Sequence, residues 1–269
     1  MAYIALQSAS SGLSALGTEL DVIANNLANV NTDGFRASRV NFEDLMYQQR
    51  AMPGVENADG NRKPTGMYVG LGVRVSGTQF DLRPGSPIST GNPLDLTIDG
   101  RGFFAVKVGD DRAEGGIAYT RAGNFTVNSE GQLVLGTSEG RLLEPAIDIP
   151  DGVQSITVTP NGGVFGLIPG DADATEFGQI QLTDFTNPGG LIPLGENLFA
   201  ESGGSGTPIS GDPDSEGFGR LISGFIESSN VDATTELVKL IRTQRAFEMN
   251  SQTIRAADEA LQTLSQLRR

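Results

Sequence analysis

Hydrophobic residues follow a helical period at both ends of the chain and lose that period in between. Near the N-terminus they recur at alternating steps of four and three residues, which is the spacing of a coiled-coil seam. This stripe consists of Ala2, Leu6, Ala9, Leu13, Leu16, Leu20, Ile23, Leu27 and Val30. A looser stripe near the C-terminus, interrupted by Gln244 and by Asn250 or Ser251, consists of Leu237, Leu240, Phe247, Ile254, Ala257, Leu261 and Leu264. We therefore expect one helix at each end, the two pairing as a coiled coil.

Capping residues give the expected limits of these helices. The first should span residues 2–29 and stop at the polar cluster of residues 31–34, where Gly34 suits a left-handed C-terminal cap. The last should start after Asn230, with Asp232 as its N-cap. Small residues along the first helix would let neighbouring helices approach closely, and they are Ala5, Ser8, Ser10, Ser11, Gly12, Ser14, Ala15 and Gly17.

Short runs of apolar residues, many of them alternating with polar ones, fill the middle of the chain. They cover residues 73–75, 94–98, 104–108, 125–127, 133–135, 156–158 and 180–182. Clusters of Asn, Gly and Pro separate them, as expected for turns. This pattern predicts an all-β domain of short antiparallel strands, a sandwich or an open barrel. The fold class is therefore mainly β with terminal α-helices.

A polar stretch separates the first helix from the strand-like region. Within residues 46–68, Pro53, Gly54, Gly60, Pro64 and Gly66 argue against a helix or a central strand. We expect an extended segment here. The chain then divides into residues 1–45 with the first helix, this extended segment 46–68, the β-domain 69–224 and the second helix 225–269.

Charge excludes several classes of partner. The chain of 269 residues has a formal net charge of −14, which disfavours binding to nucleic acid or to an anionic membrane. Residues 69–224 carry most of the excess, with eight Lys and Arg against 20 Asp and Glu. The excess is either a solvated face that maintains solubility or a repulsion against a neighbouring anionic surface.

The composition offers little for catalysis. The chain has no Cys and no His, so most metal, nucleophile and acid/base chemistry loses its usual residues. Gly100, Gly102 and Ala105 match a dinucleotide-binding spacing, but a strand continues where a helix is required. A carbohydrate-active enzyme would need a carboxylate pair in an aromatic groove, and the chain has no Trp and four Tyr. We expect no enzyme, no catalytic, cofactor-binding or metal-binding residues, and no cofactor.

The N-terminus also lacks the pattern of a secretory leader. The first basic residue is Arg36, and nothing reaches the roughly 18 apolar residues of a membrane span. If the protein leaves the cytoplasm, we expect another route.

A run of residues near the end of the first stripe is more specific. Residues 22–35, with Asn25, Asn26 and Asn29, closely resemble the N-terminal signature of bacterial flagellar rod and hook proteins. Later motifs of that family are resembled in the same order by residues 99–104, 119–125, 195–199, 224–231 and 242–250. The resemblance spans essentially the whole chain.

Within that family, residues 46–68 followed by 70–73 resemble the extra stretch that marks the distal-rod members. The resemblance implies a structural subunit that polymerises helically into a rigid hollow drive shaft and transmits motor torque to the hook. A proximal rod or hook-type axial protein is the nearest alternative. A monomeric acidic β-rich binding module is the alternative from another class, although it would not need the helical ends.

The resemblance also implies partners and a location. The partners are other copies of the chain, proximal rod proteins, the hook protein, the surrounding P- and L-ring proteins and the flagellar type III export apparatus. The location is the basal-body rod crossing the periplasm, reached without a cleaved signal peptide.

Two sets of residues are candidates for assembly. The expected interface comprises Leu13, Leu16, Leu20, Ile23, Asn25, Asn26, Leu27, Asn29, Val30, Leu237, Leu240, Phe247, Ile254, Leu261 and Leu264. Its three asparagines flank the seam, where solvated or capping roles are the alternative. A rigidity segment comprises Met52, Pro53, Pro64, Met67 and Tyr68, for which a floppy linker is the alternative.

Overall fold

The computed structural model describes residues 2–55, 62, 64–109, 112–169 and 174–267. The chain forms two compact units. The first, called the helical unit below, contains residues 1–28, 38–79 and 232–269. The second, called the β unit, contains residues 29–37 and 80–231. Neither long helix of the described chain combines the length and apolar character needed to cross a membrane.

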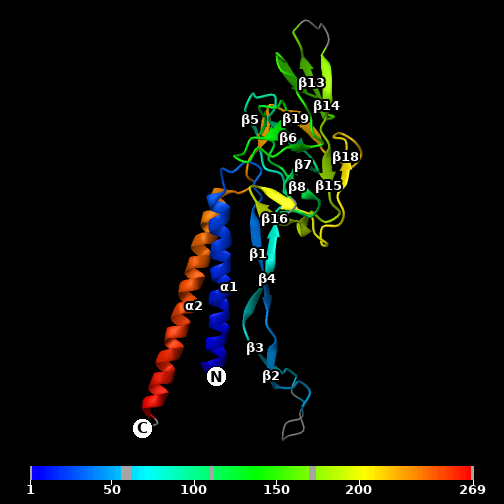
Figure 1. Ribbon diagram of the computed structural model, residues 1–269. Coiled ribbons are helices and arrows are strands. Elements are labelled where there is room, and N and C mark those ends of the chain that lie inside the picture. The colour runs from blue at the N-terminus through cyan, green and yellow to red at the C-terminus, as the bar shows by residue number, and fades with distance from the viewer. Residues whose placement is uncertain (1, 56–61, 63, 110–111, 170–173, 268–269) are drawn as a thin grey trace. The chain divides into compact units, whose positions relative to one another are not determined.

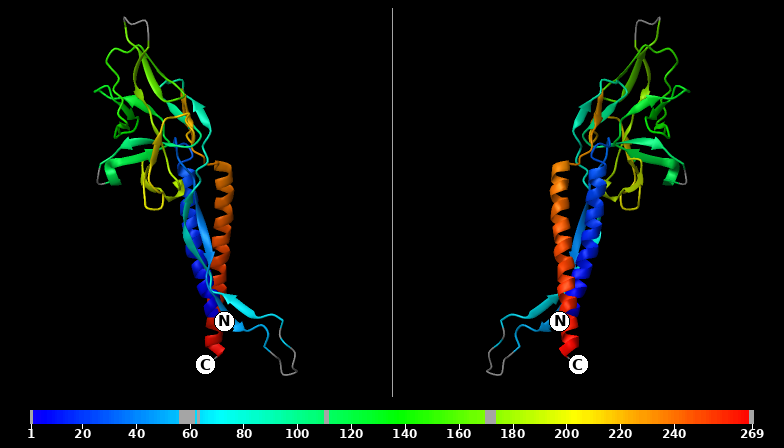
Figure 2. Two further views of the ribbon diagram at one scale, coloured as in Figure 1. Left: turned by 90° about the vertical axis from the view of Figure 1, so that its right-hand side faces the viewer. Right: turned by 90° about the vertical axis from the view of Figure 1, so that its left-hand side faces the viewer.

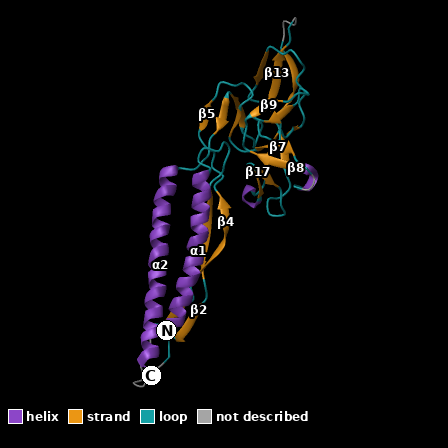
Figure 3. Cartoon of the chain, turned by 60° about the vertical axis from the view of Figure 1, so that its left-hand side comes forward, coloured by secondary structure: helices purple, strands orange, loops and turns teal. Residues whose placement is uncertain are grey.

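Two long helices dominate the helical unit. Helix α1 (Ala2–Ala28) and helix α2 (Ala233–Leu267) contact each other and run in opposite directions (Figures 1 and 2). They are purple in Figure 3, where the rest of the chain consists mainly of strands and loops. Helix α1 ends one residue before its expected end at residue 29. The terminal helices are thus confirmed.

Asp232 caps α2 as expected. Its carboxylate accepts hydrogen bonds from the Thr234 backbone N–H at 3.0 Å and from the Thr235 hydroxyl at 2.6 Å. The Thr235 hydroxyl bond is the largest cause that lowers the pKa of Asp232, and backbone N–H groups of the first turn add to it. The cap occupies backbone donors that have no partner within the helix.

Gly34 has the expected left-handed backbone, with φ of +69°, but it does not cap α1. The helix ends at Ala28, and a turn follows in which the Thr32 N–H donates to the Asn29 carbonyl. Gly34 instead donates its N–H to the Glu227 carbonyl at 2.7 Å, and a Cβ on it would come 2.7 Å from the Ala122 nitrogen. Close approach within the β unit explains this glycine.

Strands of the helical unit accompany the helices. Strands β1 (Ser38–Asp44) and β4 (Val73–Phe80) form a two-stranded sheet, and β1 contacts α1. Strands β2 (Tyr47–Ala51) and β3 (Met67–Gly70) pair antiparallel, with Tyr47 opposite Gly70 and Ala51 opposite Met67. The segment expected to be one extended stretch thus folds back on itself as a ribbon. Residues 56–61 and 63 lie outside the described residues.

The β unit is built of short antiparallel strands, as expected. Its largest sheet has seven strands, in the order β16-β17-β8-β7-β15-β18 with β11 also paired to β7. The smaller sheets are β9-β10, β12-β13-β14, β6-β19 and β5-β20. The elements are β5 (Pro87–Ser89), β6 (Leu96–Asp99), β7 (Phe103–Lys107), η1 (Glu114–Gly116), β8 (Ile117–Thr120), β9 (Phe125–Val127), β10 (Leu133–Leu135), β11 (Leu143–Glu144), β12 (Ser155–Val158), β13 (Gly163–Leu167), β14 (Thr175–Gln179), β15 (Leu182–Asp184), η2 (Pro188–Gly190), β16 (Ile192–Gly195), β17 (Leu198–Ala200), β18 (Ile209–Gly211), β19 (Arg220–Ser223) and β20 (Phe225–Glu227).

One expected strand is wrong. Residues 180–182 do not form a strand, because β14 ends at Gln179 in one sheet and β15 begins at Leu182 in another. Ile180 lies at this passage, fully buried, with its N–H bonded to the Gly162 carbonyl at 2.8 Å. An apolar residue here reflects burial and not strand periodicity.

Strand β7 shows how the core is organised. Its side chains alternate between two apolar clusters, with Phe104 and Val106 in one and Phe103 and Ala105 in the other. The Phe104 ring packs edge-on against Phe125 at 5.0 Å between centroids. Both faces of β7 are therefore covered, which explains why this run is continuously apolar.

The observed division of the chain differs from the expected one at both ends of the β-domain. Residues 69–79 belong to the helical unit, because β3 and β4 pair there with β2 and β1. Residues 29–37 and 225–231 belong to the β unit.

Candidate assembly interface

Helices α1 and α2 meet in one antiparallel register. Asn26 Nδ2 lies 3.4 Å from the Glu236 carboxylate. A Cβ on Gly12 would come 3.0 Å from Asn250 Nδ2. The two contacts are 14 residues apart in each helix, so they report the same alignment.

The side of α2 that faces α1 is partly polar. Glu236 and Thr243 are each 5% exposed, and Asn250 follows at the same spacing of seven residues. The sequence pattern placed Leu237 and Gln244 on this side of α2, one position after Glu236 and Thr243. Leu237 is 45% exposed and lies on the outward side. Glu236, Thr243 and Asn250 lie on the side of α2 that faces α1. The apolar residues of the predicted stripe are therefore rotated away from α1 by about one position.

The other expected helical positions differ in burial. Ile23 is buried, whereas Leu13, Leu16, Leu20, Leu27, Leu240 and Ile254 are half-buried. Phe247 and Leu261 are 37% and 40% exposed. Val30 lies beyond the end of α1, so the N-terminal seam does not extend to it. Leu264 belongs to α2, but its side chain is outside the described residues.

Asn26 serves an internal contact. Its Nδ2 donates to the Ser38 carbonyl at 2.8 Å and its Oδ1 accepts the Ser38 N–H at 2.9 Å. The amide thereby pairs with Ser38 as a neighbouring strand would. These two bonds hold α1 to the start of β1. Because Asn26 is 1% exposed, its side chain presents nothing to another molecule.

The two other asparagines lie in different settings. Asn25 is on the exposed side of α1. Asn29 is half-buried in the turn after α1, where its Oδ1 accepts the Thr32 hydroxyl at 3.1 Å. Asn29 therefore makes a local contact within its own turn, and a role for Asn25 or Asn29 in assembly stays a prediction.

Hydroxyl groups on α1 attach the strand connection to the helix. The Ser11 Oγ accepts the Val73 N–H at 3.2 Å. Gly72, with φ of +122°, passes so close that a Cβ would come 2.1 Å from this Oγ. Small residues on α1 thus admit a strand as well as a helix.

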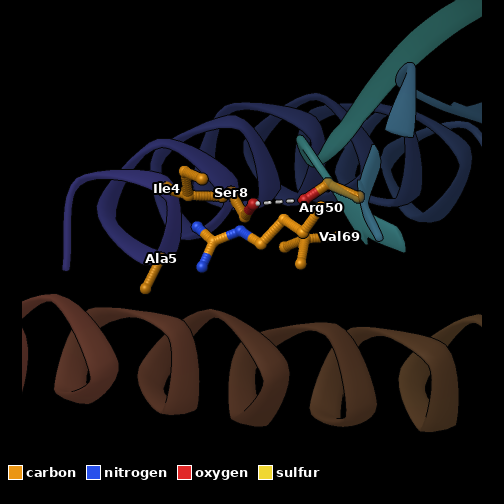
Figure 4. A pocket seen from close by; sticks show the side chains of 6 residues that line it. Ile4, Ala5, Ser8, Arg50 and Val69 are labelled. Carbon is orange, nitrogen blue, oxygen red and sulfur yellow. Dashed lines mark hydrogen bonds between the residues drawn. The ribbon is translucent and has the colours of Figure 1, made fainter. Parts of the chain in front are cut away.

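An open groove lies between the first turns of α1 and the β2–β3 ribbon (Figure 4). It has a volume of about 190 Å³ and is lined by Ile4, Ala5, Ser8, Arg50, Val69 and Gly70. The Arg50 side chain extends along α1, and the Ser8 hydroxyl donates to the Gly70 carbonyl at 3.4 Å.

The β2–β3 ribbon exposes large apolar side chains. Tyr47, Met52, Met67 and Tyr68 are 51–61% exposed, and Met46 before them is 81% exposed. Within the rigidity segment, Met52 and Pro53 follow β2, Pro64 precedes β3, and Met67 and Tyr68 lie in β3. Gly66 is tightly enclosed, since a Cβ would come 2.8 Å from the Tyr68 ring and 2.9 Å from Pro53.

A second exposed apolar surface lies on the outward side of α2. It comprises Leu237, Val238, Ile241 and Met249, which are 44–62% exposed. Contiguous exposed apolar side chains on a folded chain mark sites of protein association. In contrast, the described residues contain no group of three or more carboxylates placed to hold a metal ion.

Comparison with known proteins identifies the family. Residues 6–36 match the family described as flagella basal body rod protein, 97–166 the flagellar hook protein FlgE/F/G D1 domain, and 222–267 the flagellar basal body rod FlgEFG protein C-terminal. The chain is 43% identical to the flagellar basal-body rod protein FlgG of Caulobacter vibrioides, over 98% of this chain and 99% of the relative. It is 41% identical to FlgG of Bacillus subtilis over 98% of both chains. The chain belongs to the flagellar basal-body rod protein family.

Membership of this family confirms the resemblance found in the sequence. The chain is a structural protein of the flagellar basal body, and the family is not a family of enzymes. A rod protein named FlgF, also from Caulobacter vibrioides, is 34% identical over 87% of this chain, a weaker match than the FlgG proteins. Sequence reasoning missed Glu236 and Thr243 at the helix interface. Their spacing of seven residues with Asn250 was the signal that could have found them.

Proposed function

We propose that this chain is the structural subunit of the distal rod, polymerising helically into a rigid hollow shaft that transmits motor torque to the hook. The near full-length similarity to proteins named FlgG supports this assignment. The observation that carries the polymerisation is the exposed apolar surface of the helical unit, on the β2–β3 ribbon and on the outward side of α2.

The ribbon argues for a covering molecule. A two-stranded ribbon alone is marginally stable in water, and this one leaves Tyr47, Met52, Met67 and Tyr68 largely exposed. Another copy of the chain would bury these side chains, at about 1.5 to 3 kcal/mol for each one fully buried. Placed across an adjacent subunit, the ribbon would join neighbours along the shaft and oppose bending. Residues Met52, Pro53, Pro64, Met67 and Tyr68 then act as the rigidity segment.

The helices provide the second part of the interface. Ordering a residue costs about 1 to 2 kcal/mol of backbone entropy, and long isolated helices are only marginally stable. Helix α1 buries one side against α2 and leaves Leu13, Leu16 and Leu20 half-buried. Pairing as a coiled coil that lines the inside of a tube, with other subunits packed around it, would complete this burial.

The partners follow from this position in the flagellum. Proximal rod subunits would bind below, the hook protein above and the P- and L-ring proteins around the outside. The type III export apparatus would deliver the chain to the rod across the periplasm without a cleaved signal peptide. The acidic excess of the outer part would face the rings.

Electron microscopy of concentrated purified protein tests polymerisation. We expect straight tubes from the unaltered chain. Ile241→Asp should leave the monomer folded, because Ile241 is 49% exposed, and should prevent tube formation. Gln244→Asp, at an exposed polar position of the same helix, is the matched control. A chain that stays monomeric at every concentration would favour the monomeric binding module instead.

A further inference from the structure

The chain passes between its two units four times, after residues 28, 37, 79 and 231. Within the β unit, three stretches adjoin these crossings, namely residues 29–37, 80–86 and 227–231. They are far apart in the sequence, and many of the bonds that join them come from two residues, Glu227 and Asn230.

Glu227 binds two of the other stretches at once. Its Oε1 accepts hydrogen bonds from Arg36 Nη2 at 2.6 Å and from the Gly85 N–H at 2.7 Å. Its backbone carbonyl accepts the Gly34 N–H at 2.7 Å. Its Oε2 lies 3.7 Å from Arg121 Nη1. The Glu227 and Arg36 side chains are each 1% exposed, so these contacts are shielded from solvent.

Two buried guanidinium groups share this carboxylate. Arg121 is 6% exposed, donates to the Gly100 carbonyl at 2.7 Å and lies 5.3 Å from the Phe103 ring. Burial lowers the pKa of Arg121 to about 10, and the charge of Glu227 is the largest effect opposing that shift. Glu227 is therefore the main counter-charge within the cluster. Desolvation offsets much of the attraction in a buried ion pair, and removing one partner leaves an uncompensated buried charge.

Asn230 uses its whole amide for the same purpose. Its Oδ1 accepts the Ala37 N–H at 2.7 Å. Its Nδ2 donates to the carbonyls of Asp81 at 2.8 Å and Arg83 at 3.0 Å. The three stretches next to the crossings are thus bonded to one another twice, once around Glu227 and once around Asn230.

We propose that Glu227 and Asn230 are positioning residues that join these stretches into a single cooperative joint, which carries load along the chain between the inner and outer parts of the assembled shaft. The load-bearing part rests on the proposed rod function. The joint itself is a property of the single chain. A cooperative joint closes or opens as a whole, whereas independent hydrogen bonds would open separately.

Hydrogen exchange on the dissolved full chain distinguishes these cases. Asn230→Ala removes the bond to the Ala37 N–H but touches neither the Gly34 nor the Gly85 N–H. We expect exchange at all three amides to accelerate by about tenfold or more, with the Phe104 and Leu182 amides of the core unchanged. Acceleration at Ala37 alone would overturn the joint. Asp99→Ala, which breaks the exposed Asp99–Arg220 pair, is the control.

The reciprocal variant tests the other half of the joint. Glu227→Gln keeps the side-chain shape and removes the charge, and we expect faster exchange at Ala37, which Glu227 does not contact. An unchanged Ala37 rate would overturn the coupling. If Glu227→Gln fails to fold, Asn230→Ala decides, because it leaves the buried charges in place.

The swimming speed of cells that carry the altered chain tests whether the joint bears load. Asn230→Ala rods should form in normal number, while swimming speed falls more steeply with viscosity than in Asp99→Ala cells. Equal speeds at every viscosity would overturn the load-bearing role. Because exchange is measured on the single chain, a wild-type chain that never polymerises would count against the proposed function and leave the exchange result standing.

Discussion

Gly12 of α1 lies against Asn250 of α2 so closely that a Cβ on Gly12 would come 3.0 Å from the Asn250 Nδ2 atom. Asn26, fourteen residues after Gly12 in α1, meets Glu236, fourteen residues before Asn250 in α2, in the same antiparallel register. Polar residues within a helical seam favour one alignment over alternatives displaced by a turn. These contacts would therefore fix how the two ends of the chain align, at some cost in apolar burial.

Gly12→Ala and Gly17→Ala form a matched pair. Both replacements favour the helix by up to about 1 kcal/mol. A Cβ on Gly17 meets no atom within 4 Å, whereas one on Gly12 crowds Asn250. We expect Gly17→Ala to stabilise the chain and Gly12→Ala to lose most or all of that gain. Chemical denaturation followed by circular dichroism measures the difference, and equal stabilisation by both would contradict the close helix contact.

Gly72→Ala should be strongly destabilising. The position has φ of +122°, and a Cβ would come 2.1 Å from the Ser11 Oγ. Backbone strain of this kind costs about 1 to 3 kcal/mol before the steric clash is added. Gly77→Ala is the control, since Gly77 lies in β4 and a Cβ there would meet no atom within 4 Å. We expect the denaturation midpoint to fall for Gly72→Ala and to stay unchanged for Gly77→Ala. An unchanged midpoint for Gly72→Ala would contradict the close approach of Gly72 to Ser11.

The sequence predicted the elements with strong periodicity and failed where polar residues take structural positions. The N-terminal stripe placed α1 to within one residue, because its apolar residues recur with a helical period, although Ala9 and Ile23 are the only described residues of the stripe that are buried. The phase of α2 shifted because Glu236 and Thr243 lie in its seam, where apolar residues were expected. The β2–β3 ribbon was missed because Tyr47–Ala51 is mostly polar and Pro53 and Gly66 signalled breaks. Partners distant in the sequence, such as Glu227 for Arg36, carry no local signal.

Acid should loosen the start of α2. The pKa of Asp232 is lowered by its bonds to Thr235 and Thr234, so its stabilising effect is present above the unfolded value near 3.8 and is lost as the pH falls through the lower folded value. We expect exchange at the Thr234 amide to accelerate in that acidic range, relative to amides in the middle of α2. Asp232→Asn keeps a capping oxygen without a titrating group. The acceleration should be absent in this variant, and its persistence would assign the effect to another group.

Leu20→Asp should block assembly and leave the β unit folded. Leu20 is half-buried on α1. Assembly would bury a charge at this position in every subunit, and each burial would cost several kcal/mol. Leu27→Asp should behave alike. Ala24→Asp, at an exposed position of the same helix, is the control. The number of tubes is counted in electron micrographs, and the protection of the β7 amides from hydrogen exchange reports whether the β unit is folded. Normal tubes from both leucine variants would exclude the seam as an assembly interface.

Deleting residues 48–65 should give polymers that form but bend. The deletion removes most of β2, the exposed Met52 and the connection to β3, including Pro53 and Pro64, so β3 loses its partner strand while α1 and α2 remain. If the ribbon crosses onto an adjacent subunit, its contacts oppose the sliding between neighbours that curvature requires. The persistence length of tubes in micrographs should then fall well below that of the unaltered chain. Tubes of unchanged stiffness would show that the segment is a linker, and the rigidity of the shaft would have to come from the helices.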